Sequence, residues 1–243
     1  MKRITYDIEL NVERTHWWFV GRRRLLKLLL SSKIHENPLL LDVGCGVGSN
    51  LSLLDSMGFK VIGLDSEIYS LSLTKRRFSA IPLINGNLLS LPFKTNSIEI
   101  IIASDVLEHL EEDTIGIKEI HRVLKQEGEA ILTVPAFQFL WGIQDEVGSH
   151  KRRYSKNQFI KKIEREGFEV LRSSYFNFFL FFPILLIRRI IQLFNLKVES
   201  ENNINSPFLN SIFKAVFSLE PYLLKYFVFP FGVSFFCIMR KAD

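Results

Sequence analysis

Three glycines at alternating positions, Gly44, Gly46 and Gly48, form the part of the chain best suited to holding a ligand. They follow the apolar run 39–43, which is typical of a buried parallel strand, and glycine lets backbone amides approach a ligand closely. A helix that begins after such a turn directs free N–H groups toward the same ligand. Asp65 ends the next apolar run, about 20 residues on, where a carboxylate can accept hydrogen bonds from ribose hydroxyls. This arrangement predicts a nucleotide-type pocket.

A second group of candidate chemical residues, Asp105, Glu108 and His109, follows the apolar run 99–104. Their spacing puts the three side chains on one helical turn. It allows three interpretations, which are support for the pocket, a general base supplied by His109, and a divalent ion held by the trio. We assign His109 to the catalytic residues and assign no residue to a metal.

The segment 145–154 contains another histidine within a dense set of charged residues. His150 can deprotonate an acceptor hydroxyl, because the ordinary pKa of histidine is about 6.5. Arg152 and Arg153 can hold a phosphate or a carboxylate. We predict His150 and Tyr154 as catalytic residues. The alternative is that the segment forms caps and salt bridges that lead into the next helix.

Alternating strands and helices must position these residues. Apolar runs separated by amphipathic stretches indicate an α/β fold with a parallel sheet and right-handed crossovers. The predicted strands span residues 39–43, 60–64, 82–87, 99–104, 129–134, 168–176 and 231–240. The predicted helices span residues 11–32, 51–58, 69–79, 114–124, 155–166, 177–196 and 207–226, the last broken at Pro221, and 137–154 is predicted as a loop.

The glycine spacing differs from the G-x-G-x-x-G of dinucleotide sites and resembles motif I of the class I S-adenosylmethionine (SAM)-dependent methyltransferases, roughly D-x-G-x-G-x-G. The frame 86–93 resembles the family's G-D-x-x-x-L-P-F, with Asn87 in place of the acid that binds the adenine amine. The resemblance implies SAM as cofactor and a Rossmann-like seven-stranded, mostly parallel sheet with helices on both faces and an antiparallel last strand. The residues that it assigns to SAM are Asp42, Gly44, Cys45, Gly46, Gly48, Asp65, Ser66, Asn87, Leu88 and Ser104.

Three further segments resemble a methyltransferase subfamily of types 11 and 12, often linked to cell-envelope, lipid or glycan biosynthesis. They are H-W-W-F at 16–19, H-x-R-R-Y at 150–154 and P-F-G-x-S at 230–234. The resemblance implies a small, hydrophobic or lipid- or glycan-linked acceptor, with O-methylation favoured. The ion interpretation of the Asp105 trio depends on its similarity to an E-x-x-E-H cluster of some O-methyltransferases. The rival functions are a nicotinamide-dependent oxidoreductase and a SAM-binding membrane partner without turnover.

The N-terminal helix carries adjacent tryptophans, Trp17 and Trp18. It either packs on the sheet or forms a lid over the pocket. Adjacent residues cannot share one helix face, so we expect at least one tryptophan outside the core. The predicted organisation is a single methyltransferase domain, 1–243, with a helical cap 1–36, a SAM-binding core 37–176, an apolar helical insertion 177–230 and the last strand 231–243.

The insertion is the least regular part of the pattern. Its apolar run 178–187 is shorter than the roughly 20 residues that span a bilayer. It is either a helical pair packed on the sheet, or a cover for a hydrophobic acceptor or an in-plane membrane contact through 178–195. In the second case Arg188 and Arg189 are expected to meet lipid phosphates.

The composition favours an anionic partner. The formal net charge is +5, and 22 phenylalanines cluster in apolar blocks rather than alternating with basic residues. This favours a lipid surface and excludes nucleic acid from the expected partners. The N-terminus lacks an apolar signal core, so we expect a cytoplasmic protein, peripheral at the inner face of the membrane. The oligomeric state is left open.

Overall fold

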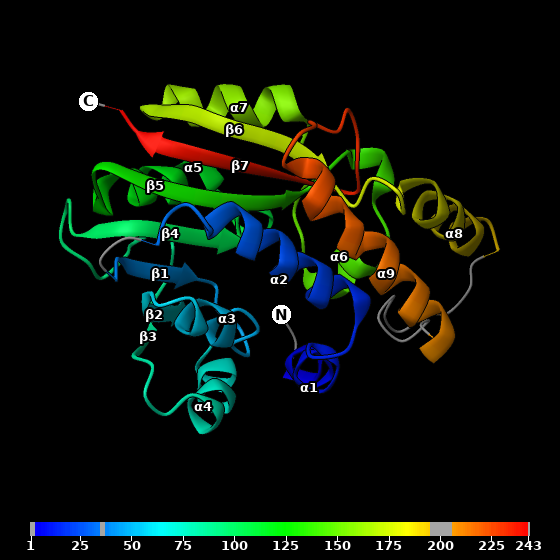
Figure 1. The fold of residues 1–243 in the computed structure, drawn as a ribbon, viewed down its shortest axis with the longest axis horizontal. Helices are drawn as coiled ribbons and strands as arrows, with labels where there is room; N and C mark the ends of the chain where they lie inside the picture. Colours follow the sequence, from blue (N-terminus) through cyan, green and yellow to red (C-terminus); the bar gives the residue numbers. More distant parts are fainter. Residues whose placement is uncertain (1–2, 35–36, 195–205, 243) are drawn as a thin grey trace.

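The computed structural model describes residues 3–34, 37–194 and 206–242. Its centre is a seven-stranded sheet in the order β3-β2-β1-β4-β5-β7-β6 (Figure 1). This confirms the predicted Rossmann-like α/β fold. The strands are β1 Leu39–Val43, β2 Lys60–Asp65, β3 Leu83–Asn85, β4 Ile98–Ser104, β5 Leu124–Pro135, β6 Phe168–Phe176 and β7 Ser234–Lys241. The helices are α1 Arg3–Val12, α2 Trp17–Leu30, α3 Leu51–Ser56, α4 Ile68–Arg77, α5 Asp113–Val123, α6 Ile143–Gly148, α7 Lys156–Arg165, α8 Phe181–Leu193 and α9 Pro207–Leu224, with 3-10 turns η1 Leu107–His109 and η2 Gln138–Leu140.

The central strands are parallel and end in register. Val43 at the end of β1 pairs with Leu64 of β2 and with Ala103 of β4. The residues that follow, Gly44 and Asp65 among them, therefore emerge side by side at the carboxyl edge of the sheet. That edge is where ligands bind in open α/β sheets.

The last strand, β7, lies between β5 and β6 and is antiparallel to both (Figure 1). Phe235 and Phe236, which point to opposite faces, are both buried, so β7 is covered on both sides. The predicted antiparallel last strand is confirmed. It begins at Ser234 rather than at 231.

The N-terminal segment forms two helices, where one was predicted over 11–32. The chain turns between α1 and α2 because His16 caps α2, its Nδ1 accepting a hydrogen bond from the Trp18 amide at 3.3 Å. Glu13 fixes the turn through ion pairs with Arg23 at 2.8 Å and Arg77 at 2.5 Å. Histidine is an uncommon cap, so the sequence pattern did not reveal this boundary.

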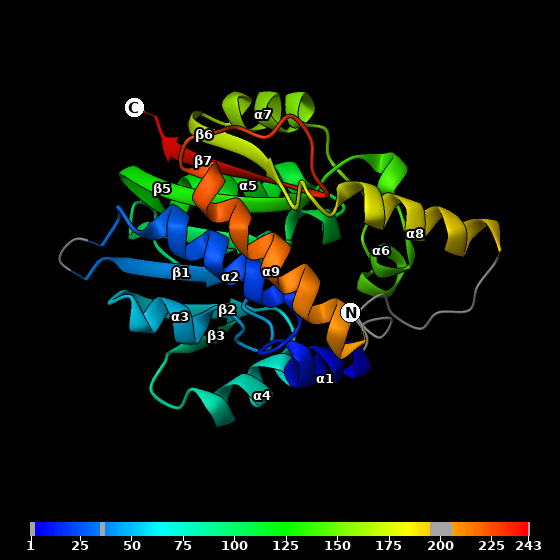
Figure 2. The same cartoon turned by 45° about the vertical axis from the view of Figure 1, so that its right-hand side comes forward.

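Helices α2 and α9 lie side by side across one face of the sheet (Figures 1 and 2). Phe217 of α9 joins them, with its ring 5.8 Å from that of Trp17 and 5.7 Å from that of Trp18. Both tryptophans are half-buried against the core, so the expectation that one would lie outside it is wrong. Trp17 and Trp18 point to different sides of α2, and the ring of Phe217 contacts both of them.

Further differences from the prediction concern α6, β5 and α9. The expected loop 137–154 contains α6, because the Asp145 carboxylate accepts the Gly142 amide at 2.8 Å and caps it. Strand β5 begins at Leu124 instead of 129, because its pairing with β4 shifts register between Ile98 and Ile100 and keeps the intervening residues in the strand. Helix α9 continues through Pro221 to Leu224, so the predicted break is absent from this described helix.

The two insertion helices differ in their surroundings. Helix α9 packs on α2, whereas α8 stands out from the end of the sheet (Figure 2). Among the described residues, no helix has the length and apolarity needed to cross a bilayer. The predicted polar linker 199–206 lies outside the described residues except for Ser206, which caps α9.

Candidate active site

A cavity of about 460 Å³ opens at the carboxyl edge of β1, β2 and β4. Its walls come from α1, α2, the glycine loop, η1, α6 and α8. The residues predicted from the sequence that line it are Gly44, Cys45, Gly46, Asp65, Ser66, Asn87, Leu88, Ser104, His109 and His150. Three others, Asp42, Gly48 and Tyr154, are not among the residues that line it.

The glycine loop has the backbone conformation that its sequence predicts. Gly44 and Gly46 have φ values of +70° and +54°, which side chains rarely adopt. A Cβ on Gly44 would lie 2.5 Å from the Val106 side chain, whereas a Cβ on Gly46 would meet nothing within 4 Å. Gly46 therefore leaves open space beside the backbone, and a ligand can approach the loop there.

Asp65 connects the loop to β2. One carboxylate oxygen accepts the Gly46 amide at 2.8 Å and the other accepts the Glu67 amide at 2.8 Å. Burial raises the pKa of Asp65, and these two hydrogen bonds oppose the shift. Each oxygen has a second lone pair, so the carboxylate is still able to accept hydrogen bonds from a pair of ribose hydroxyls.

Asp42 and Gly48 support the loop from below. Asp42 is buried in β1, and burial raises its pKa to about 7. At Gly48, where φ is +81°, a Cβ would lie 2.7 Å from the Phe78 ring and 2.9 Å from Thr74. Close packing beneath the loop thus explains the third glycine. The sequence pattern does not separate these supporting positions from those that line the cavity.

The turn after β3 forms another side of the cavity. Leu88 is buried, whereas Asn87 is exposed at the rim. The Asn87 side-chain oxygen accepts the Leu89 amide at 2.9 Å. Because this oxygen keeps a second lone pair, the amide is able to meet an adenine amine, as predicted for the acid that it replaces.

Helices α1 and α2 contribute cavity residues that the sequence did not identify, namely Tyr6, Glu9 and Arg22. Arg22 forms an ion pair with Asp105 at 2.7 Å, and burial raises the pKa of Glu9 to about 7 although Arg22 opposes it. Tyr6 and Glu9 were not identified because they belong to α1, a helix that the sequence did not predict. An arginine run such as that around Arg22 is more often solvent-exposed, so its pattern gave no indication of a buried partner.

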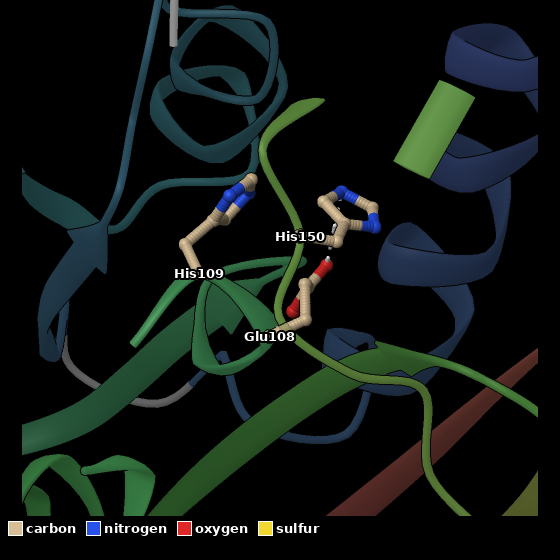
Figure 3. Close-up of side chains that lie close together, drawn as sticks. All are labelled: Glu108, His109 and His150. Atoms are coloured by element: carbon tan, nitrogen blue, oxygen red, sulfur yellow. Dashed lines mark ion pairs between the residues drawn. The ribbon is translucent and has the colours of Figure 1, made fainter. Parts of the chain in front are cut away.

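Glu108, His109 and His150 come together in the lining of the cavity (Figure 3). The rings of His109 and His150 are 4.7 Å apart, and His150 Nε2 lies 4.0 Å from Glu108 Oε1. Burial, and then the neighbouring His150, lower the pKa of His109 to about 4, so its ring is neutral at pH 7. Burial, with the nearby Asp105 charge, raises the pKa of Glu108.

Asp105 does not join this group. Its carboxylate is occupied by Arg22 and by the Thr133 hydroxyl, which donates at 3.3 Å. The trio of Asp105, Glu108 and His109 considered from the sequence is therefore replaced by one that includes His150. The sequence spacing did not reveal this, because His150 belongs to a segment far along the chain.

Asp145 organises the histidine-containing segment. It accepts hydrogen bonds from His150 Nδ1 at 2.8 Å and Arg153 Nε at 2.9 Å, and Arg188 lies at 3.7 Å. Burial by itself raises the pKa of this carboxylate, but the bond to His150 and the arginine charges lower it to about 2. The Nδ1–Asp145 bond directs the other ring nitrogen of His150 toward Glu108.

The arginines in and near this segment make bonds within the protein. Arg152 donates to the carbonyls of Leu110 at 3.0 Å and Glu111 at 2.7 Å. Arg188 is buried in α8 and donates to the Leu140 carbonyl, which corrects its expected contact with lipid phosphates. Together with the Arg153–Asp145 pair, these bonds agree with the salt-bridge interpretation of the segment.

Tyr154 is not brought to the cavity with the two histidines. Its buried hydroxyl donates to Asp113 at 2.9 Å, and burial raises its pKa. A hydroxyl committed in this way has a structural role at the start of α7. His150 and Tyr154 belong to one H-x-R-R-Y segment, but of these two residues His150 alone lines the cavity.

Comparison with known proteins agrees with this geometry. Residues 41–132 match the family model described as a methyltransferase domain. The chain is 34% identical over 169 residues to the uncharacterized protein MJ0638 of Methanocaldococcus jannaschii, covering 68% of this chain and 72% of that protein. It is 28% identical over 133 residues to a Mycolicibacterium smegmatis protein named a probable S-adenosylmethionine-dependent methyltransferase, covering 54% of this chain and 52% of the relative.

The fold is similar to that of solved methyltransferases. Phosphoethanolamine N-methyltransferase 2 of Haemonchus contortus, solved in complex with S-adenosyl-L-methionine, superposes with a TM-score of 0.60 at 17% identity, covering 90% of this chain and 52% of that one. The family match, the relatives and a glycine loop with an acid at the end of β2 agree with one another. The chain belongs to the class I SAM-dependent methyltransferases, and SAM is its cofactor.

Proposed function

We propose that this enzyme methylates a hydroxyl group on a hydrophobic, lipid- or glycan-linked acceptor. The observation that carries the proposal is that one cavity is lined both by Gly46 and Asp65, here called the donor end, and by His109, His150 and residues of the insertion, here called the acceptor end. SAM supplies a methyl group on a positively charged sulfur that is already a good leaving group. The chain has to bind two molecules in line and activate an oxygen.

The donor end of the cavity suits SAM. Gly46 provides the open backbone, and Asp65 provides acceptor oxygens next to it at 2.8 Å from the Gly46 amide. Leu88 offers a buried apolar side chain to an adenine face. Tyr6 and Arg22 close this end from α1 and α2 and limit the access of water to it.

The acceptor end is flanked by the insertion. Ile184 and Arg188 of α8 line the cavity together with Val233, which precedes β7. These residues support the interpretation of the insertion as a cover for a hydrophobic acceptor. His150 Nε2 is the basic atom of this end, since Asp145 accepts a hydrogen bond from Nδ1 and so holds the proton there. We propose that Nε2 faces the acceptor hydroxyl and assists the removal of its proton.

We also propose that α8 rests on an anionic membrane surface. Its residues Phe182, Leu186, Ile190 and Leu193, named here the α8 apolar face, are 64%, 62%, 40% and 77% exposed. Their spacing puts them on one side of the helix, opposite the buried Arg188 and Ile191. The exposed Arg189 and the net charge of +5 suit anionic headgroups. A membrane-bound enzyme would meet a lipid-linked acceptor where that acceptor resides.

A transfer assay tests the function. The purified enzyme and SAM labelled with tritium in the methyl group are incubated with fractionated lipids, glycans and quinone precursors from the source cells. We expect the label in a lipid-extractable product. The product should keep its label after alkaline ester hydrolysis, because a methyl ether is stable to that treatment. Label confined to a water-soluble amine product would contradict the proposed acceptor class.

A further inference from the structure

Glu108, His109 and His150 form a compact set of metal-binding groups in the acceptor end of the cavity. One ligand atom from each of the three residues lies within 4.8 Å of the others. In Figure 3 the Glu108 carboxylate is directed toward His150, which comes from a different segment of the chain. All three residues line the cavity, so a ligand bound between them is accessible to a substrate.

The Glu108 carboxylate lacks the partners that a buried acid needs. Its side chain is 0% exposed, and neither oxygen has a hydrogen-bond partner within the described part of the chain. A buried carboxylate without hydrogen bonds is costly unless a cation or a proton neutralises it. His150, at 4.0 Å, is too distant for a hydrogen bond. The carboxylate oxygens are therefore available to a cation.

The ring of His150 is oriented as a metal ligand. Asp145 accepts a hydrogen bond from His150 Nδ1 at 2.8 Å, which leaves the Nε2 lone pair for a metal. Carboxylates commonly fix metal-binding histidines through their second nitrogen in this way. Arg153, at 2.9 Å, keeps Asp145 in place.

We propose that Glu108, His109 and His150 bind one divalent transition-metal cation, of which Zn²⁺ is the best match. Two imidazoles and one carboxylate are a ligand set found in catalytic zinc sites, whereas Mg²⁺ and Ca²⁺ prefer oxygen ligands alone. Three protein ligands leave coordination positions open toward the cavity.

The role of the cation rests on the proposed function. A cation at this position would hold the acceptor oxygen and lower the pKa of its hydroxyl, whose proton passes to water. The oxygen then forms a bond to the methyl carbon while the carbon–sulfur bond breaks and its electron pair stays on sulfur. In that case the histidines act as ligands and do not take the proton themselves.

The test measures metal binding directly. Protein without a polyhistidine tag is treated with a chelator and titrated with Co²⁺, a spectroscopic substitute for Zn²⁺, while the visible absorption of bound Co²⁺ is recorded. We compare the wild type with Glu108→Gln, His109→Gln and His150→Gln. His121→Gln is the control, because His121 packs edge-on against Phe168 outside the cavity.

We expect one equivalent of Co²⁺ in the wild type and in His121→Gln, displaced by Zn²⁺, and binding at least about ten-fold weaker in each ligand variant. The proposal is overturned if the wild type binds no Co²⁺, or if the ligand variants bind it as tightly as the wild type. Circular dichroism identifies a variant that fails to fold. The comparison of Co²⁺ binding is then made with the remaining variants. Calorimetry with SAM on the same samples separates the two proposals, because SAM binding without Co²⁺ binding refutes only the metal site.

Discussion

Asp145 contacts the side chains of His150 and Arg153 from its own segment and that of Arg188 from α8, and it thereby orients the ring of His150. The Nδ1 proton of His150 is directed at the carboxylate at 2.8 Å, so its other nitrogen faces Glu108 and the cavity. Arg153 and Arg188 neutralise the carboxylate within the protein. At the scale of single residues, the acceptor end therefore depends on one buried acid that orients His150.

Replacing His150 tests this arrangement. In His150→Gln we expect turnover to fall about 100-fold, because an amide neither withdraws a proton nor presents a basic nitrogen to a cation. SAM affinity should change little, since Asp65 bonds to Gly46 and His150 bonds to Asp145, so the two sets of residues are not joined by a hydrogen bond. Radiolabel transfer and calorimetry measure the two quantities, with His121→Gln as the matched control. Full turnover in His150→Gln would remove the residue from the mechanism.

Glu220 gives a prediction about pH. It is buried in α9, where its carboxylate accepts the amides of Asn177 at 2.6 Å and Phe179 at 3.1 Å. Burial outweighs these bonds and raises its pKa from 4.5 to about 7. The folded protein thus holds the proton more tightly than the unfolded chain, so stability from this group is full below pH 4.5 and is lost as pH rises through about 7.

We therefore expect Glu220→Gln to change the pH dependence of unfolding. Between pH 4.5 and pH 8 the wild type should lose on the order of 3 kcal/mol of unfolding free energy through Glu220, and the variant should not. Urea unfolding at several pH values measures both proteins. Parallel curves for the two proteins would show that Glu220 titrates equally in the folded and unfolded states.

At the scale of elements, the contact between α2 and α9 holds the N-terminal cap on the sheet. Gly21 lets the helices approach closely, because a Cβ there would lie 2.1 Å from the Phe217 ring. Gly21→Ala should destabilise the protein by about 1–3 kcal/mol, more than the gain of up to about 1 kcal/mol in helix propensity. Thermal and urea unfolding measure the change.

A second substitution serves as the control for Gly21→Ala. Phe217→Leu makes room next to Gly21, so the double variant should be more stable than the sum of the two single effects predicts. Strictly additive changes in the free energy of unfolding would mean that the two residues do not interact.

The α8 apolar face gives the membrane prediction. Leu186→Glu should reduce binding to vesicles of phosphatidylglycerol and phosphatidylcholine by roughly ten-fold, because it removes an apolar group and adds repulsion. The matched control is Ile68→Glu in α4, since Ile68 is 70% exposed and Leu186 is 62% exposed. Vesicle co-sedimentation measures both variants. Equal loss in the two variants, or none in Leu186→Glu, would argue against a membrane contact through α8.

Element boundaries show what local sequence determines. The runs 39–43, 60–64 and 99–104 predicted strands close to those observed, because buried parallel strands have continuous apolar sequence. Helix α6 was missed because its cap is the Asp145 carboxylate at 2.8 Å, within a segment whose charges resemble those of a loop. Helix α1 was missed because the apolar residues of segment 4–12 alternate along the sequence, a spacing more typical of a strand than of a helix.

At the scale of the whole molecule, the parallel sheet brings the two ends of the cavity together. The donor end follows β1, β2 and β3, and the acceptor end follows β4 and β5, with the cap and α8 added around them. The donor residues were predictable because they lie within one turn of their strands. The pairing of Glu108 with His150 was not, because it depends on how a distant segment folds back across the edge of the sheet.

Every assignment depends on SAM lying at the Gly46–Asp65 end of the cavity, and calorimetry tests this most directly. We predict that the wild type and Asp55→Ala, an exposed control in α3, bind one SAM with equal affinity, whereas Asp65→Ala binds it at least about ten-fold more weakly. The expected loss of affinity is that of the hydrogen bonds that the charged Asp65 carboxylate accepts from the two ribose hydroxyls of SAM. Unchanged SAM affinity in Asp65→Ala would contradict the account.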